Sequence, residues 1–378
     1  MMVIKNRYHS HFVKHQGKMG LNAPLLVCLL FLSSSRSLPT SKNQRALGLF
    51  NIIRFSNDEC ETLSSTDAAR RQGVCMRTNE CETQRGEADG GCAAGFGVCC
   101  VLSVSNCGGS ITRNTTYIQN PGFPSKFVRS DTTTCTYNIP RSMEGICSIR
   151  LDFNTLRIRN ASPNDGDCGN EFFTARPGTG AIVPNFCGVL SGQHMYLSSG
   201  TEGDLGSITF NFDPNSDVSR MWDIKVAMIP CYSRVVPPDG CLQYYFGIAG
   251  TITNYNFGTL LQNTAYNMCI RREIGFCKVL YTVDDTSKSV NPFGLGKSTS
   301  SKTSTGLCNE AQLQIPSTIS ANKDNVYCGD TLSTRDGNDV NAAITSDITP
   351  FLVRLMTRKG QKISGSTGFK LQYVQLPC

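Results

Sequence analysis

The sequence has little charge, few aromatic residues and almost no histidine. Charged residues make up 17% of the 378 residues and aromatic residues 8%, and tryptophan occurs once. Beyond residue 37 a single histidine remains, His194, which excludes a site built on several histidines in that part of the chain. No run reaches the about 18 apolar residues of a transmembrane helix, so we expect no membrane span.

The net positive charge is concentrated at the N-terminus. The formal charge is +7, but residues 1–37 hold five basic residues and no acidic one, which leaves 31 basic against 29 acidic residues. A chain so close to neutral lacks the basic excess of nucleic-acid-binding proteins. We therefore predict no nucleic-acid partner.

The same N-terminal segment has the composition of a secretory signal peptide. Ala23–Leu32 is a ten-residue apolar stretch that follows basic residues, and the small residues Ser33, Ser35 and Ser37 come next. Such a stretch is too short to span a bilayer. We predict a signal peptide over residues 1–37 and a secreted, extracellular protein, with an N-terminal anchor as the alternative.

Glycine, proline and cysteine are plentiful instead. The 35 glycines and 16 prolines indicate a turn-rich, all-β chain rather than a helical one. Nineteen cysteines are too many for a reduced cytosolic protein of this size. These counts favour a disulfide-bonded protein of an oxidising compartment.

The cysteines divide the chain into three parts. Cys28 lies in the predicted signal peptide, and the other eighteen fall into three groups of six. The second and third groups both open with an interval of 28 residues and end with their longest interval, which predicts a small module at 60–100 and two related domains at 107–231 and 241–378. The three groups are Cys60, Cys75, Cys81, Cys92, Cys99, Cys100; Cys107, Cys135, Cys147, Cys168, Cys187, Cys231; and Cys241, Cys269, Cys277, Cys308, Cys328, Cys378.

An even number of cysteines in each group is what closed sets of disulfides require. Zinc is the other common use of clustered cysteines, but the chain beyond residue 37 has one histidine and no Cys-x-x-Cys pair. We therefore predict that all eighteen cysteines are bridged within their own groups, with no metal site and no cofactor.

Alternation of apolar and polar residues predicts antiparallel strands in both repeats. Ile149, Leu151 and Phe153 alternate with polar residues in the first repeat, and stretches 208–212 and 224–228 behave alike. The second repeat shows the pattern at 279–283, 351–355 and 369–373. The predicted fold class is all-β, with two antiparallel β-sandwich domains after a small disulfide-rich module.

Three segments interrupt this pattern. Residues 101–106 and 232–240 are predicted linkers, the second made semi-rigid by Pro237-Pro238. Residues 285–306 are rich in Ser, Thr, Gly and Lys, and we predict that they form a mobile surface insertion of the second repeat.

The first repeat resembles a CUB domain. It opens with CGGSITRNTTYIQNPGFPSKF, has CTYNIP at Cys135, and places Cys168 and Cys187 nineteen residues apart. The second repeat is more divergent but keeps CGD at Cys328 and ends GFKLQYVQLPC. The resemblance covers about 107–378 and implies two jelly-roll sandwiches. It implies the bridges Cys107–Cys135, Cys168–Cys187, Cys241–Cys269 and Cys308–Cys328, which leaves Cys147–Cys231 and Cys277–Cys378 by elimination.

Residues 60–100 resemble a clip module of arthropod secreted proteins. A Cys-x5-Cys pair, an isolated cysteine and a terminal Cys-Cys carry this resemblance. It implies the bridges Cys60–Cys99, Cys75–Cys92 and Cys81–Cys100. The order of a small module and two CUB repeats is similar to that of arthropod secreted CUB proteins.

Many CUB domains bind calcium through an acidic triad and use the ion to hold a partner's lysine. Here Glu171 stands at one acidic position, Asp213 or Asp217 could supply a third, and the preceding family glutamate is replaced by Arg/Asn-rich sequence at 157–160. One glutamate and one aspartate are few for a cation that takes six or more oxygens. We therefore interpret these acids as solvated surface residues.

Clip modules often precede serine proteases, so the chain could contain the catalytic residues of a protease. His194 is the one histidine available beyond residue 37, and no GDSGG-like, GxSxG or HExxH segment occurs. We interpret His194 as a partly buried strand residue and the chain as a non-enzyme.

Recognition remains as the predicted function. We predict a secreted binding or adaptor protein whose CUB-like domains recognise an extracellular protein or glycan. The alternatives are a modulator of an extracellular serine-protease cascade and a structural component of matrix or secretion.

Two glycosylation sequons and one cluster of basic residues occur in the two repeats. Asn114 and Asn160 stand in N-glycosylation sequons, although Pro163 follows the second sequon and lowers its expected occupancy. Basic residues also surround Gly360 and could bind a polyanion such as heparan sulfate, with a solvated hairpin as the other reading. They are Arg354, Arg358, Lys359 and Lys362.

Overall fold

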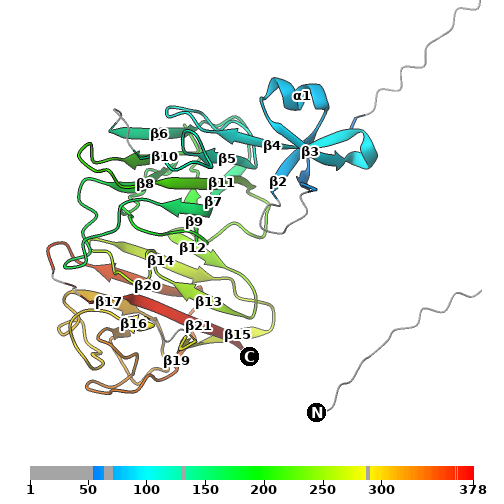
Figure 1. Ribbon diagram of the computed structural model, residues 1–378. Coiled ribbons are helices and arrows are strands. Elements are labelled where there is room, and N and C mark those ends of the chain that lie inside the picture. The colour runs from blue at the N-terminus through cyan, green and yellow to red at the C-terminus, as the bar shows by residue number, and fades with distance from the viewer. Residues whose placement is uncertain (1–53, 64–70, 129–132, 287–289, 362, 364) are drawn as a thin grey trace, which may run out of the picture. The chain divides into compact units, whose positions relative to one another are not determined.

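The computed structural model describes residues 54–63, 71–128, 133–286, 290–361, 363 and 365–378 (Figure 1). The predicted signal peptide, residues 1–37, lies outside these ranges. The described chain is built of twenty-one strands, one short α-helix and one 3-10 turn. The predicted all-β fold class is confirmed.

The N-terminal module is small and closed by three disulfides. Its core consists of Val74, Met76, Leu102 and two half-cystines. Gly86 lies so close to this core that a Cβ atom there would come 2.2 Å from the Cys100 sulfur, so glycine is required. The elements are β1 (Glu59–Glu61), β2 (Gln72–Met76), α1 (Thr78–Thr83), β3 (Glu87–Cys92), the 3-10 turn η1 (Ala93–Gly95) and β4 (Gly97–Val104).

The predicted linker at 101–106 is wrong. Strand β4 continues through Val104 and pairs in parallel with β5, with Leu102 opposite Thr116 and Val104 opposite Ile118. The apolar run Val101–Leu102 is buried, which explains why this segment extends the sheet instead of crossing solvent. The module and the first sandwich therefore share one sheet, of strand order β1-β2-β4-β5-β11-β7-β9.

The first sandwich packs part of this sheet against the three-stranded sheet β6-β10-β8. The alternation in β7 is confirmed, since Ile149, Leu151 and Phe153 are buried. Trp222 is fully buried, with its ring 4.4 Å from that of Phe210. The strands are β5 (Thr116–Gln119), β6 (Thr134–Ile139), β7 (Ile146–Arg157), β8 (Phe172–Pro177), β9 (His194–Ser198), β10 (Gly206–Asn211) and β11 (Met221–Pro230).

The second sandwich repeats this architecture with the sheets β12-β14-β20-β17-β18 and β13-β21-β15-β19. Its core includes Tyr281, Leu371 and Tyr373, at alternating positions that the sequence pattern predicts. The strands are β12 (Cys241–Tyr245), β13 (Ala249–Thr253), β14 (Ala265–Ile270), β15 (Phe276–Val283), β16 (Phe293–Gly294), β17 (Ala311–Gln314), β18 (Val326–Tyr327), β19 (Ile344–Ser346), β20 (Phe351–Thr357) and β21 (Gly368–Pro377).

The predicted insertion at 285–306 is part of the sandwich over its described residues from 290 onward. Phe293 and Leu295 are buried in the core, and β16 pairs with β21. Ser301 is also buried, with its hydroxyl hydrogen-bonded to the backbone of Arg335. Composition suggested mobility, but two large apolar side chains anchor the segment.

Nine disulfides join the eighteen cysteines within their three groups. Cys147–Cys231 and Cys277–Cys378 span 84 and 101 residues and join the residue that follows β11 to β7 and the residue that follows β21 to β15. Loops of that length each contribute about 4–5 kcal/mol by restricting the unfolded chain. These bridges have the connectivity predicted from the sequence: Cys60–Cys99, Cys75–Cys92, Cys81–Cys100, Cys107–Cys135, Cys147–Cys231, Cys168–Cys187, Cys241–Cys269, Cys277–Cys378 and Cys308–Cys328.

The two sandwiches share an apolar core. Tyr255 of the second is 1% exposed, and its ring lies 4.5 Å from Phe186 and 6.4 Å from Phe153 of the first. Its hydroxyl donates to the His194 carbonyl over 2.8 Å. Gly188 has φ +89° and faces Asn256 so closely that a Cβ there would come 2.1 Å from the Asn256 oxygen. The interface between the two sandwiches is therefore close-packed, and the sandwiches are not joined by a flexible linker alone.

Candidate recognition groove

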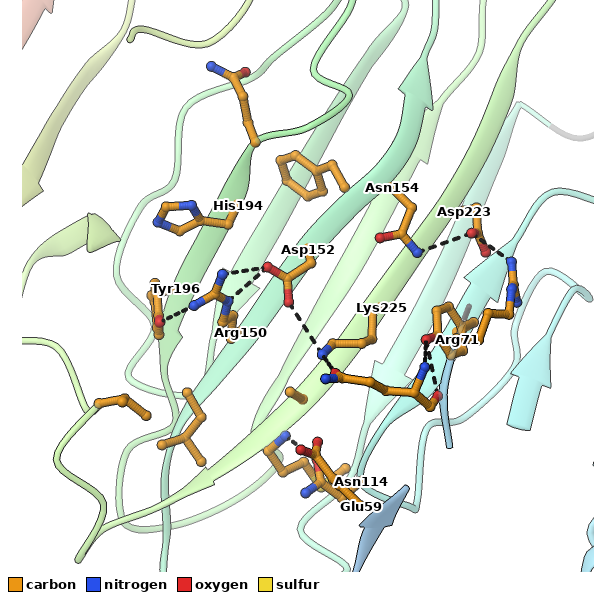
Figure 2. A pocket seen from close by; sticks show the side chains of 18 of the residues that line it. Glu59, Arg71, Asn114, Arg150, Asp152, Asn154, His194, Tyr196, Asp223 and Lys225 are labelled. Carbon is orange, nitrogen blue, oxygen red and sulfur yellow. Dashed lines mark hydrogen bonds and ion pairs between the residues drawn. The ribbon is translucent and has the colours of Figure 1, made fainter. Parts of the chain in front are cut away.

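A polar groove of about 1220 Å³ crosses the outer face of the first sandwich (Figure 2). Its floor is formed by β7, β9 and β11, and further lining comes from β1 and β2 of the N-terminal module and from residues 233–235. We call it the charged groove. The residues that define it here are Glu59, Glu61, Arg71, Gln72, Asn114, Arg150, Asp152, Asn154, His194, Tyr196, Asp223, Lys225 and Ala227.

Strand alternation places the charges on this face. Core positions of β7 and β11 point between the sheets, so the residues between them, Arg150, Asp152 and Lys225 among them, point outward. Register then sets their neighbours, because Lys225 lies opposite Asp152 and Ala227 lies opposite Arg150. Oppositely charged cross-strand pairs stabilise a sheet.

A chain of ion pairs crosses the floor. The Arg150 guanidinium lies 2.7 Å from Asp152, whose second oxygen lies 3.8 Å from the Lys225 ammonium. Lys225 also donates to the side-chain oxygen of Gln72 on β2. The groove floor is thus linked to the N-terminal module, as Figure 2 shows.

Asp223 is the second link between module and sandwich. It is 4% exposed and accepts from Arg71 at 2.7 Å, Gln119 at 3.0 Å and Asn154 at 3.2 Å. The Arg71 guanidinium also stacks 4.4 Å from the centre of the Tyr117 ring. Arg71 is the donor that comes from the N-terminal module, so the Arg71–Asp223 pair joins the module to the sheet. Gln119 and Asn154 hold the carboxylate from within the sheet.

His194 lies at the end of the groove nearest the second sandwich. Its Nε2 accepts a hydrogen bond from the Tyr244 backbone N–H at 3.1 Å. Burial, with a smaller effect of the nearby Arg150 charge, lowers the pKa of His194 to about 4. The imidazole is therefore neutral at physiological pH, and its acceptor nitrogen is occupied by the partner sandwich. Its position at the start of β9 agrees with the strand placement predicted from the sequence.

The interpretation of Glu171 as a solvated acid is wrong. Glu171 is 0% exposed and forms a two-pronged ion pair with the buried Arg220, at 2.9 Å to Nε and 2.6 Å to Nη2. The backbone N–H of Arg159 also donates to it. Asp213 is half-buried and pairs with the Arg159 guanidinium at 3.0 Å, whereas Asp217 is exposed. An arginine thus neutralises the glutamate at the family's acidic position.

This pairing predicts that calcium has no effect on stability. Both oxygens of Glu171 are engaged by donors, so binding a cation would require breaking a buried ion pair. We expect equal melting temperatures in millimolar calcium and in excess chelator. A ligand at about 100 times its dissociation constant would add about 2.7 kcal/mol, so a rise of several degrees in calcium would show that a site forms.

The other predicted surface residues fall in different places. Asn114 is half-buried at the groove, and its side-chain oxygen accepts from the Met228 backbone N–H at 2.6 Å. Asn160 is exposed beyond the end of β7. Arg354, Arg358 and Lys359 are exposed on and after β20, and Lys362 lies outside the described residues.

The charged groove could not be predicted from the sequence. Its residues come from strands far apart in the chain, and its wall depends on how the module lies on the sheet. One signal was present: Arg150, Asp152 and Lys225 are charged residues on the polar sides of two strands. That signal alone also fits an ordinary solvated face.

Comparisons with known proteins agree on the family. The model of the CUB domain matches residues 107–225, and that of the animal CUB domain matches residues 238–376. No curated protein matches the sequence. Among the described residues no helix could cross a membrane.

The chain is remotely similar to a number of solved structures, three of which are as follows. The human MASP-1/3 CUB1-EGF-CUB2 domain is 15% identical, with a TM-score of 0.25, over 70% of this chain and 100% of that one. The rat MASP-1 CUB1-EGF-CUB2 domains are 14% identical, with a TM-score of 0.26, over 72% of this chain and 99% of that one. The N-terminal CBM22-1-CBM22-2 tandem domain of Paenibacillus barcinonensis Xyn10C is 9% identical, with a TM-score of 0.18, over 73% of this chain and 90% of that one. On its two family matches, the chain belongs to the CUB-domain proteins, with two CUB β-sandwiches after a disulfide-rich N-terminal region.

Proposed function

We propose that this chain is an extracellular adaptor that binds a protein partner in the charged groove. The observation that carries the proposal is the construction of the groove, in which strands of the first CUB domain, the N-terminal module and the segment after β11 line one recess. A surface fixed by disulfides and ion pairs loses little conformational entropy on binding.

The charge of the groove favours a protein over a polyanion. The groove lining includes three basic residues, Arg71, Arg150 and Lys225, and four acidic ones, Asp152, Asp223, Glu59 and Glu61. Nucleic acids and sulfated glycans need a basic excess. A protein surface that presents both signs of charge is the complementary partner.

Binding rather than catalysis also fits the one histidine of the groove. A general base must present a free nitrogen to its substrate. The Nε2 of His194 instead accepts the Tyr244 N–H, and the ring packs 4.9 Å from Tyr245. We propose that the chain is not an enzyme.

We also propose that the protein is secreted and that it acts in a protease cascade. The apolar stretch Ala23–Leu32 would direct secretion, and nine disulfides suit an oxidising compartment. The clip-like cysteine pattern of residues 60–100 would associate the protein with an extracellular protease cascade of arthropod type, as a modulator.

Blocking the groove tests the proposal. Ala227 is a small, half-buried residue on the groove floor, so Ala227→Tyr fills the recess without removing a polar contact. Thr251→Tyr adds the same side chain on an exposed position of β13 in the second CUB domain. The three proteins, once immobilised, would capture partners from extracellular fluid that contains the protein, with identification by mass spectrometry.

We expect a discrete partner to be retained by the unsubstituted protein and by Thr251→Tyr, and at least tenfold less by Ala227→Tyr. Equal retention by all three proteins would place the contact elsewhere. Recovery of the native protein chiefly in insoluble matrix would favour a structural role instead.

A further inference from the structure

A second recess lies beyond the C-terminal end of β7, and none of its residues lines the charged groove. It has a volume of about 440 Å³. Two arginines, three aliphatic residues and two polar residues form its walls. We call it the basic cleft, and these residues are Arg157, Ile158, Arg159, Asn160, Val189, Val218 and Ser219.

The two arginines of the basic cleft are in different states. Arg159 is tied to Asp213 at 3.0 Å, and its backbone N–H donates to the buried Glu171. Arg157 is exposed, and among the described residues it has no ion pair and no side-chain hydrogen bond. The cleft therefore presents one guanidinium whose five donors are available to a ligand.

The walls are held in place from behind. Arg157 pairs through its backbone with Val189, and the Val189 N–H donates to Asn256 of the second CUB domain at 3.0 Å. The Glu171–Arg220 pair fixes the backbone of residue 159 on the opposite side. An arginine on such a frame can bind a carboxylate through two parallel hydrogen bonds.

The surroundings favour a single carboxylate over a polyanion. Asp213 lies beside Arg159, and exposed Asp217 precedes Val218, so repeated negative charges would meet repulsion at the rim. Val189 is 41% exposed and offers apolar contact to the methylene groups of an acidic side chain. We propose that the basic cleft receives an aspartate or glutamate side chain of a protein partner, with Arg157 as its main ligand.

This inference rests on the proposed function in that the partner is a protein, but it concerns a different surface. A glycan at Asn160 would stand in the cleft, so the test uses the full-length protein with Ser162→Ala. That change removes the Asn-x-Ser acceptor sequence and leaves every residue of the cleft intact.

Selection from a phage-displayed library of random 12-residue peptides gives the test. We expect selected peptides to share an Asp or Glu next to an apolar residue. Synthetic copies with Asn or Gln at that position should bind at least tenfold more weakly, and so should the original peptides to Arg157→Glu. The matched control, Arg358→Glu, reverses an exposed arginine of the second CUB domain and should bind normally.

Arg157→Gln provides a milder variant, and equal melting temperatures would show that both proteins fold. Peptides without acidic residues, or unchanged affinity in Arg157→Glu and Arg157→Gln, would overturn the inference. Binding of a heparin hexasaccharide with no binding of acidic peptides would overturn it as well. Since Ala227→Tyr leaves the cleft intact, the groove and the cleft can fail independently.

Discussion

Replacing Arg220 by methionine should destabilise the first CUB domain by about 3–5 kcal/mol, because Glu171 would remain as a buried and unpaired carboxylate. Arg220 is 1% exposed, and its guanidinium also donates to the backbone carbonyls of Val128 and Ser216. Urea unfolding followed by circular dichroism at neutral pH measures the loss as a lower midpoint with an unchanged slope.

The double variant Arg220→Met/Glu171→Leu is the matched control. It removes both charges, so it should regain most of the lost stability, since apolar replacement of a buried ion pair is often neutral. A single variant as stable as the unsubstituted protein would show that the pair is not buried in solution. That result would reopen Glu171 as a cation ligand.

Replacing Tyr255 by alanine, as a separate single substitution, should lower the free energy of unfolding by about 3–5 kcal/mol, the usual loss for a large aromatic side chain in a packed core. The ring fills the contact between the two CUB domains, against Phe153 and Phe186. The hydroxyl bond to the His194 carbonyl is lost as well. Urea unfolding is again the measurement, with the expected midpoint well below that of the unsubstituted protein.

Tyr255→Phe separates the ring from its hydroxyl. It keeps the aromatic contact and leaves the His194 carbonyl without this donor, which should cost about 1 kcal/mol. If Tyr255→Ala were about as stable as Tyr255→Phe, the ring would make no stabilising packing contact, and the two CUB domains would move independently.

Much of the fold could be predicted because it depends on two features that the sequence shows directly: the alternation of neighbouring residues and the number and spacing of the cysteines. Period-two alternation at Ile149, Leu151 and Phe153 depends only on neighbouring residues. Cysteine spacing divides the chain, and the repeated interval of 28 residues identifies the two related domains.

The joints between modules could not be predicted from composition. Residues 101–106 are short and follow the last cysteine of the module, which is typical of a linker, yet Leu102 is buried and pairs with β5. Tyr255 follows a polar stretch. Nothing in the sequence shows that its ring packs against Phe186, which lies 69 residues earlier in the first CUB domain. Such contacts depend on complementary shapes of folded surfaces.

The functional surfaces escaped prediction for a related reason. The acidic residues near Glu171 in the sequence predict a solvated cluster, whereas its partner Arg220 lies 49 residues later. The groove joins Arg71 to Asp223 across 152 residues. Charged residues on the polar side of a strand reveal their partners only once strand register is known.

The groove and the domain interface require that the N-terminal module and both CUB domains behave as one body, because the module and the first CUB domain line the groove and the Tyr255 contact joins the two CUB domains. Scanning calorimetry of the unsubstituted protein with its disulfides intact tests this requirement most directly. We expect one transition whose calorimetric enthalpy equals its van't Hoff enthalpy. Two or three separated transitions, or a calorimetric enthalpy two to three times the van't Hoff value, would contradict it.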